Sequence, residues 1–144
     1  MPGNITSADA IVMLAVNDLF NTPIQLQGFS ADNIFEGDSI NSAELSMGID
    51  GLLSGGFTFK EIPWSIELQA DSDSNQLFDT WWPRQQQNRG LYIANGSVQL
   101  PAIGKKWNLT RGFLTGYKPM PDAQKTLRPR RYQITWNALV PAPI

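Results

Sequence analysis

The chain has 144 residues and a net charge of −2, and it contains neither cysteine nor histidine. This length is typical of one domain of about 100–150 residues, so we expect a single domain over residues 1–144. Without cysteine there is no disulfide or thiolate chemistry, and without histidine the usual general base and the commonest zinc ligand are missing. Serine–histidine and cysteine–histidine mechanisms are excluded, and we expect no enzyme, no metal site and no cofactor.

The charges are sorted along the chain. Residues 1–83 contain twelve carboxylates and one base, Lys60, a net charge of −11, whereas residues 84–144 contain ten bases and one acid, Asp122, a net charge of +9. Opposite surface charges steer the encounter of partners and fix their register. The sorting therefore favours a protein that associates with further copies of itself.

The longest uncharged apolar run, residues 10–16, is far shorter than the about 20 residues that span a bilayer. No basic residue precedes this run, as one would in a secretory signal. We therefore expect a soluble protein that is made in a cytosol.

Alternation of polar and apolar residues dominates the chain and predicts half-buried strands. The alternation is clearest at residues 64–70 and 132–140. Weaker strands are predicted at residues 11–16, 24–29, 43–49, 91–100 and 107–117. Within the fourth of these, Asn95 and Gly96 form either a tight hairpin turn or a bulge.

One segment has helical rather than strand periodicity, with apolar residues at i, i+1, i+4 and i+5. These residues are Leu77, Phe78, Trp81 and Trp82. Ser72 or Asp73 is expected to cap the start of this helix, and Pro83 is expected to limit its length. The elements together predict a mainly β fold, an antiparallel β-sandwich or partly closed barrel with one flanking α-helix.

The glycine-rich loop at residues 51–57 contains three large apolar residues, Leu52, Leu53 and Phe57. A solvated loop has no reason to keep them, because burial of each such side chain is worth about 1.5–3 kcal/mol. Two interpretations remain open. The loop folds back on its own core, or it is an arm that inserts into a neighbouring subunit.

The acidic stretch at residues 71–75 resembles the start of a calcium-binding loop. That loop requires glycine at its sixth position and glutamate at its twelfth, where this chain has Gln76 and Trp82. A helix start explains the acids better. Glu44 and Glu67 are the carboxylates that would serve a glycosidase, but no spacing singles them out among the acids.

A basic stretch near the C-terminus contains Arg128, Arg130 and Arg131, followed by Tyr132 and Trp136. Bases interleaved with aromatic residues can bind nucleic acid, although both aromatic residues fall on the apolar face of a predicted strand. The arginines are our candidates for charge contacts between copies. The alternative is that they form a solvated strand edge that prevents aggregation.

The order of these elements resembles that of the tail tube proteins of long-tailed bacteriophages, and most of all the small tube-like proteins of contractile-tailed phages. The segments that carry the resemblance are residues 11–16, 28–32, 43–51, 78–82 and 133–136, together with the glycine-rich loop. The tube proteins of type VI secretion systems and contractile bacteriocins are similar to the same family.

The resemblance implies a structural virion protein whose hexameric rings stack into the tail tube, a channel for DNA. It also implies a tail sheath, a baseplate and a tail terminator as partners, and assembly in the cytoplasm of a bacterial host. A polar, acidic lining would let DNA pass, because binding DNA requires cations that release its counterions. The lumen-facing candidates are Glu44, Ser46, Ser65, Glu67 and Gln69. The alternatives are another tail component, such as a terminator or baseplate hub, and a nucleic-acid-binding β-barrel module.

Overall fold

The computed structural model of the chain describes residues 10–29, 35–37, 43–57 and 60–143. Within these ranges there are nine strands, one α-helix and one short 3-10 helix. The strands are β1 (Ile11–Val16), β2 (Phe20–Gln25), β3 (Phe35–Gly37), β4 (Ala43–Met47), β5 (Leu53–Phe57), β6 (Ile62–Leu68), β7 (Ala94–Leu100), β8 (Lys105–Gly116) and β9 (Arg130–Pro143), and the helices are α1 (Asn75–Asn88) and η1 (Pro101–Ile103). The predicted class is confirmed, because the fold is a mainly β, antiparallel, incompletely closed barrel with one helix.

Seven strands form one sheet in the order β2-β1-β7-β8-β9-β6-β3, and β4 pairs with β5 in a separate two-stranded sheet. All of these pairs are antiparallel. Strands from the acidic first half of the chain lie at both edges of the large sheet, and strands from the basic second half lie in its middle. The two halves are therefore interleaved, and the charges sorted along the sequence do not form two separate halves of the body.

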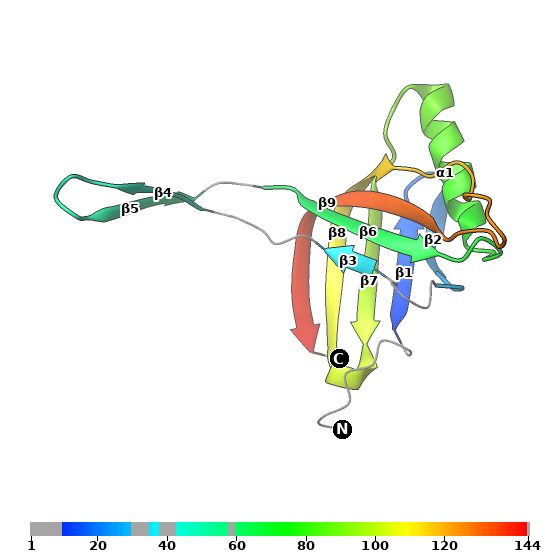
Figure 1. The fold of residues 1–144 in the computed structure, drawn as a ribbon, viewed down its shortest axis with the longest axis horizontal. Helices are drawn as coiled ribbons and strands as arrows, with labels where there is room; N and C mark the ends of the chain where they lie inside the picture. Colours follow the sequence, from blue (N-terminus) through cyan, green and yellow to red (C-terminus); the bar gives the residue numbers. More distant parts are fainter. Residues whose placement is uncertain (1–9, 30–34, 38–42, 58–59, 144) are drawn as a thin grey trace.

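The long strand β9 lets the sheet curl over itself. Its residues 130–136 pair with β6, and its residues 133–143 pair with β8. Figure 1 shows β9 bending between these parts, so that β6 and β3 cross over the layer formed by β1, β7 and β8. The Trp136 indole packs on Gly112 of β8, where a Cβ atom would fall 2.4 Å from the ring. Glycine leaves the space that this indole needs.

Aromatic side chains fill the core between the curled sheet and α1. Trp81, Trp136, Tyr132 and Phe78 are the largest fully buried residues of the described chain. Phe78 of α1 stacks on Tyr132 of β9, with ring centroids 3.9 Å apart and planes inclined by 6°. Such contacts add to the free energy of area burial, so they fix the helix against the sheet.

The helix α1 continues through Pro83, and the prediction that this proline limits the helix is wrong. Proline removes one backbone hydrogen bond and crowds the carbonyl four residues earlier. Trp81, two residues before Pro83, is fully buried in the core, and Trp82 stacks on Tyr117 with ring centroids 5.4 Å apart. This packing stabilises the helix around the proline. The helix instead ends at Arg89, which has a left-handed φ of 49° and donates its amide to the Gln85 carbonyl.

The N-cap of α1 is Ser74 rather than the predicted Ser72 or Asp73, and its side chain makes no capping hydrogen bond to the helix. Buried Asn75 joins the helix to the sheet instead. Its side-chain carbonyl accepts a hydrogen bond from the Tyr132 hydroxyl at 2.8 Å, and its amide donates to the Ser72 carbonyl at 3.0 Å. These bonds satisfy polar groups that would otherwise be costly to bury.

Several strand boundaries differ from the predictions, although β1 matches them. The second strand begins at Phe20 rather than residue 24, because Asp18 adopts a left-handed φ of 69° and closes a tight hairpin with β1. The bulge interpretation of Asn95 and Gly96 is confirmed, since the register between β7 and β8 shifts there and Arg111 opposite has a φ of 51°. The last strand, β9, continues to Pro143 and is longer than the predicted 132–140.

Candidate assembly surface

The hairpin of β4 and β5 projects away from the large sheet (Figure 1). We call residues 43–57 the arm. Residues that lie directly opposite each other in an antiparallel pair share one face of the sheet. The apolar face of the arm consists of the pairs Ala43–Phe57, Leu45–Gly55 and Met47–Leu53, and the polar face consists of Glu44–Gly56 and Ser46–Ser54. The arm is therefore an amphipathic ribbon.

The tip of the arm is specified by its own residues. The Gly48 amide donates to the Leu52 carbonyl at 2.8 Å, and the Gly51 amide donates to the Gly48 carbonyl at 3.0 Å. Gly51 has a φ of 84°, which glycine adopts at no steric cost. The Asp50 carboxylate accepts the Leu52 amide at 3.1 Å. These features close the hairpin through a short loop with a left-handed glycine.

Every residue of the arm is exposed. Leu53 keeps 58% of its surface, Phe57 keeps 71%, and Ile49 at the tip is fully exposed. Monomeric proteins rarely expose contiguous apolar patches of more than a few hundred Å², and larger ones mark interaction sites. The exposure contradicts the interpretation in which this segment folds back on its own core.

The structure brings two of the three predicted arm residues onto one face. Leu53 and Phe57 lie on the apolar face, whereas Leu52 adjoins the turn. Sequence reasoning missed Leu45 and Met47, which complete this face at 66% and 65% exposure. Alternation in residues 43–47 was the available signal, but only the pairing with β5 shows which residues share a face.

Arg130, predicted to contact another copy, is buried within its own chain at 5% exposure. Its guanidinium donates to both carboxylate oxygens of Asp79 on α1, at 2.7 and 3.2 Å, and to the Lys118 carbonyl at 2.8 Å. It also lies over the rings of Tyr117 and Tyr132, 5.7 and 5.3 Å from their centroids. Arg130 therefore joins the helix, the loop after β8 and the sheet, and we no longer assign it a contact between copies.

This ion pair affects the acid–base properties of its partners. The hydrogen bond from Arg130 lowers the pKa of the Asp79 carboxyl, although partial burial opposes the effect. Burial raises the pKa of the Tyr132 hydroxyl. Both shifts favour the state seen here, with an ionised carboxylate and a neutral phenol. We call this cluster, in which Arg130 holds Asp79 and the Lys118 carbonyl, the clamp.

Arg131 lies on the outer face of the sheet, on the opposite side of β9 from the core. One of its guanidinium nitrogens donates to Glu36 of β3 and to the Ser65 hydroxyl of β6, each at 2.8 Å. Glu67 lies directly opposite Arg131, and Gln133 lies opposite Ser65. We call these five residues the outer polar face. Both partners of the Glu36 ion pair are about half exposed, so the pair adds at most about 1 kcal/mol.

The five lumen-facing candidates do not gather in one place. Ser65 and Glu67 belong to the outer polar face, and Gln69 follows the end of β6. Glu44 and Ser46 lie on the polar face of the arm. The structure of one chain thus gathers Ser65 with Glu67 and leaves the two arm residues apart from them.

The remaining basic and aromatic candidates are Arg128, Tyr132 and Trp136, of which only Arg128 is exposed. Arg128 is exposed in the loop before β9 and donates to the Gln124 side chain at 3.1 Å. Tyr132 and Trp136 are fully buried. They have no ring face on which a nucleic-acid base could stack, which removes the stacking platform required by a nucleic-acid-binding module.

Neither a metal site nor a membrane-spanning helix is found within the described residues. No three or more acidic side chains gather there in a way that could hold a metal ion. The helix in that part of the chain is too short and too polar to cross a bilayer.

The chain was compared with known proteins. The sequence profile of a family described as tail fiber protein gp32 matches residues 3–140. No curated protein sequence matches the chain.

Several solved structures share the fold. A chain of the anti-feeding prophage tube-terminating cap aligns with a TM-score of 0.64 and 10% identity, over 100% of this chain and 94% of that chain. A chain from the sheath/tube terminator of an extracellular contractile injection system aligns with a TM-score of 0.61 and 13% identity, over 91% and 92%. A chain of the anti-feeding prophage baseplate aligns with a TM-score of 0.57 and 12% identity, over 99% and 98%. Identities this low establish a shared fold.

Proposed function

Because this chain belongs to the tail fiber protein gp32 family, we propose that it is a structural subunit of a bacteriophage tail whose copies form the stacked hexameric rings of the tail tube. The observation that carries this proposal is the exposed apolar face of the arm. A lone two-stranded hairpin is marginally stable in water, so a partner that covers this face would stabilise the arm. The function is assembly and passive conduction, without catalysis.

Stacking follows from the asymmetry of the subunit. The arm leaves the body on one side (Figure 1), so the surface that receives it on the next copy is a different surface. Contacts between unlike surfaces are heterologous and generate rings or open helical stacks, depending on whether the rotation closes. A tube needs both kinds of contact, within a ring and between rings.

The outer polar face is our candidate for the channel lining. Its base, Arg131, is bonded to Glu36, and Glu67 adds a second carboxylate beside it. Tight binding of DNA requires cations that displace its counterions. A lining of this composition offers phosphate no unpaired cation from these residues, so DNA would slide along it.

The proposal includes the place of the protein in the particle. We infer that it resides in the virion tail, that it assembles in the cytoplasm of a bacterial host, and that a sheath, a baseplate and a terminator contact it. A second candidate function is supported by the fold, which is shared with a tube-terminating cap and with a baseplate component. A subunit of that kind would form one ring and would not stack into long tubes.

The arm provides a matched test. In Leu53→Asp a carboxylate replaces an apolar side chain on the apolar face, and in Ser54→Asp the same carboxylate is added to the polar face one residue later. Losing one buried leucine costs about 1.5–3 kcal/mol per contact. We therefore expect Leu53→Asp to abolish tubes and Ser54→Asp to retain them.

The measurement is electron microscopy and sedimentation of both purified variants at equal concentration. Circular dichroism should show the same thermal transition for the two, because both substitutions are on the exposed arm. Tubes of equal length and yield from Leu53→Asp and Ser54→Asp would contradict the proposed role of the arm.

A further inference from the structure

A second apolar feature, a groove with a volume of about 180 Å³, lies between the two layers of the curled sheet. One wall consists of Phe35 of β3 and Trp64 of β6, and the other includes Val98, Trp107 and Leu139 of β7, β8 and β9. Small-molecule sites usually have volumes of about 300–1,000 Å³. The groove is smaller than these sites and suits one or two inserted side chains.

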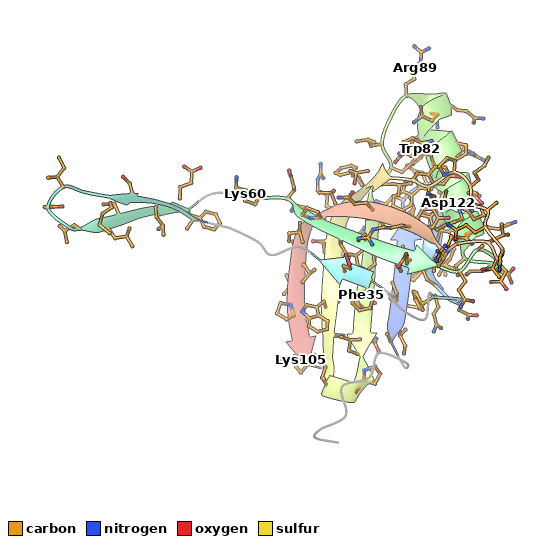
Figure 2. The ribbon with its side chains drawn as sticks, in the orientation of Figure 1. Phe35, Lys60, Trp82, Arg89, Lys105 and Asp122 are labelled. Atoms are coloured by element: carbon orange, nitrogen blue, oxygen red, sulfur yellow. The ribbon has the colours of Figure 1, made fainter. Side chains whose placement is uncertain are left out.

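The wall formed by β7, β8 and β9 continues along β8 to a basic residue, Lys105. Trp107 and Lys105 are two residues apart on β8, so they lie on the same face. Leu100 lies opposite Lys105, and Leu139 lies opposite Leu109 on that face. Figure 2 shows Lys105 at the lower end of β8, with Phe35 above it on the strand that crosses the sheet. The apolar wall therefore ends at an exposed lysine.

We propose that this groove receives one or two side chains from the apolar face of the arm of a second copy of the chain. The inference rests on the proposed self-assembly and names the surface that accepts the arm. The two surfaces match in chemistry, since both are apolar and each has charge at its margin. The arm contains two acids, Glu44 and Asp50, and no base, whereas Lys105 marks the end of the groove. Opposite charges at the margins would fix the register of insertion.

The geometry of one chain favours a second copy over self-docking. The arm points away from the body (Figure 1), and all of its residues remain exposed. Each copy has one arm and one groove, so every copy can insert its arm into one neighbour and receive the arm of another. A contact of this type between unlike surfaces closes into a ring or continues as an open stack, depending on the rotation between copies.

Crosslinking tests this contact directly, because the natural chain has no cysteine. Leu53→Cys on the arm and Leu139→Cys in the groove are made as separate variants, one carrying a tag that changes its mass. They are mixed, assembled and treated with a short bismaleimide. We expect a mixed-mass dimer at least fivefold more abundant than in the control mixture of Ser54→Cys with Leu139→Cys. Electron microscopy of the same samples records whether particles form.

The possible outcomes separate this inference from the function on which it rests. Particles with the expected crosslink support the groove as the acceptor. Particles in which Leu53→Cys gives no more mixed dimer than Ser54→Cys overturn the groove and leave the tube function standing. A chain that forms no particle under any condition overturns both.

A charge variant gives an independent measurement on the uncrosslinked protein. Lys105→Glu places a carboxylate where the arm brings its own acids, so we expect the concentration needed for assembly to rise about tenfold. Lys125→Glu, in an exposed loop outside the groove, is the matched control and should leave that concentration unchanged. Equal behaviour of these two variants would overturn the proposed orientation of the arm in the groove.

Discussion

Replacing Arg130 with methionine removes a buried guanidinium while keeping a side chain of similar length. The guanidinium makes hydrogen bonds to Asp79 and to the carbonyls of Lys118 and Pro119. Removing one partner of a fully buried ion pair costs about 3–5 kcal/mol. Here the Asp79 side chain is 43% exposed, so water can solvate it after the loss, which reduces the cost. We expect a decrease of about 2–4 kcal/mol in the free energy of unfolding, including the loss of two cation–π contacts worth about 0.5–1 kcal/mol each.

Urea denaturation followed by tryptophan fluorescence measures this change, because Trp81 and Trp136 lie in the core. Arg128→Met is the matched control, since Arg128 is exposed and its side chain bonds only to that of Gln124 among the described contacts. A surface substitution of this kind changes stability by at most about 0.5 kcal/mol. If both variants lose the same free energy, or if Arg130→Met loses less than about 0.5 kcal/mol, the clamp does not join helix, loop and sheet as described.

Two further predictions concern stability. The pKa of Asp79 is lowered in the folded state, so its stabilising effect is present above the pKa of the unfolded chain, about 3.9, and is lost as the pH falls through the folded value. Asp79→Asn should therefore have a lower free energy of unfolding than the natural chain at pH 7. Unfolding measured over a range of pH should show this difference shrinking below about pH 4, and a difference that is independent of pH would refute the linkage. Gly112→Ala forces a methyl group against the Trp136 ring and should cost about 1–3 kcal/mol or more by overpacking, whereas Gly56→Ala meets no atom within 4 Å and should be nearly neutral in thermal melts.

The strands that were predicted best from the sequence are those with one buried face, because burial of every second residue produces the alternation. β6 has buried Trp64, Ile66 and Leu68 on one face, and the pattern is visible without knowledge of the fold. β5 was not predicted, because its two central glycines carry no strand signal. It is a strand because β4 pairs with it, and pairing partners are not written in a local pattern.

The extent of α1 also depends on contacts with residues that are distant in the sequence. The apolar stripe predicts where α1 lies, but a local rule gave Pro83 too much weight. Burial of Trp81 holds the helix in place around Pro83, and that burial depends on a sheet assembled from distant segments. Arg130 is the clearest case, since its partner Asp79 lies 51 residues away. A basic stretch looks the same in the sequence whether it is solvated or buried.

The candidate assembly surface was predictable in part. Apolar residues in a glycine-rich segment singled out Leu53 and Phe57, but the sequence left open whether this segment folds back on its own core or forms an arm. The groove could not be predicted, because its two walls come from β3 and β6 on one side and from β7, β8 and β9 on the other. Only the curl of the sheet brings these strands into apposition.

Electron microscopy of the purified natural chain, over a range of protein concentrations and without any other tail protein, shows whether the chain assembles by itself. We expect rings of six copies with an open channel, which stack into hollow tubes as the concentration rises. A chain that remains a monomer at every concentration, with its apolar arm permanently in water, would contradict this expectation.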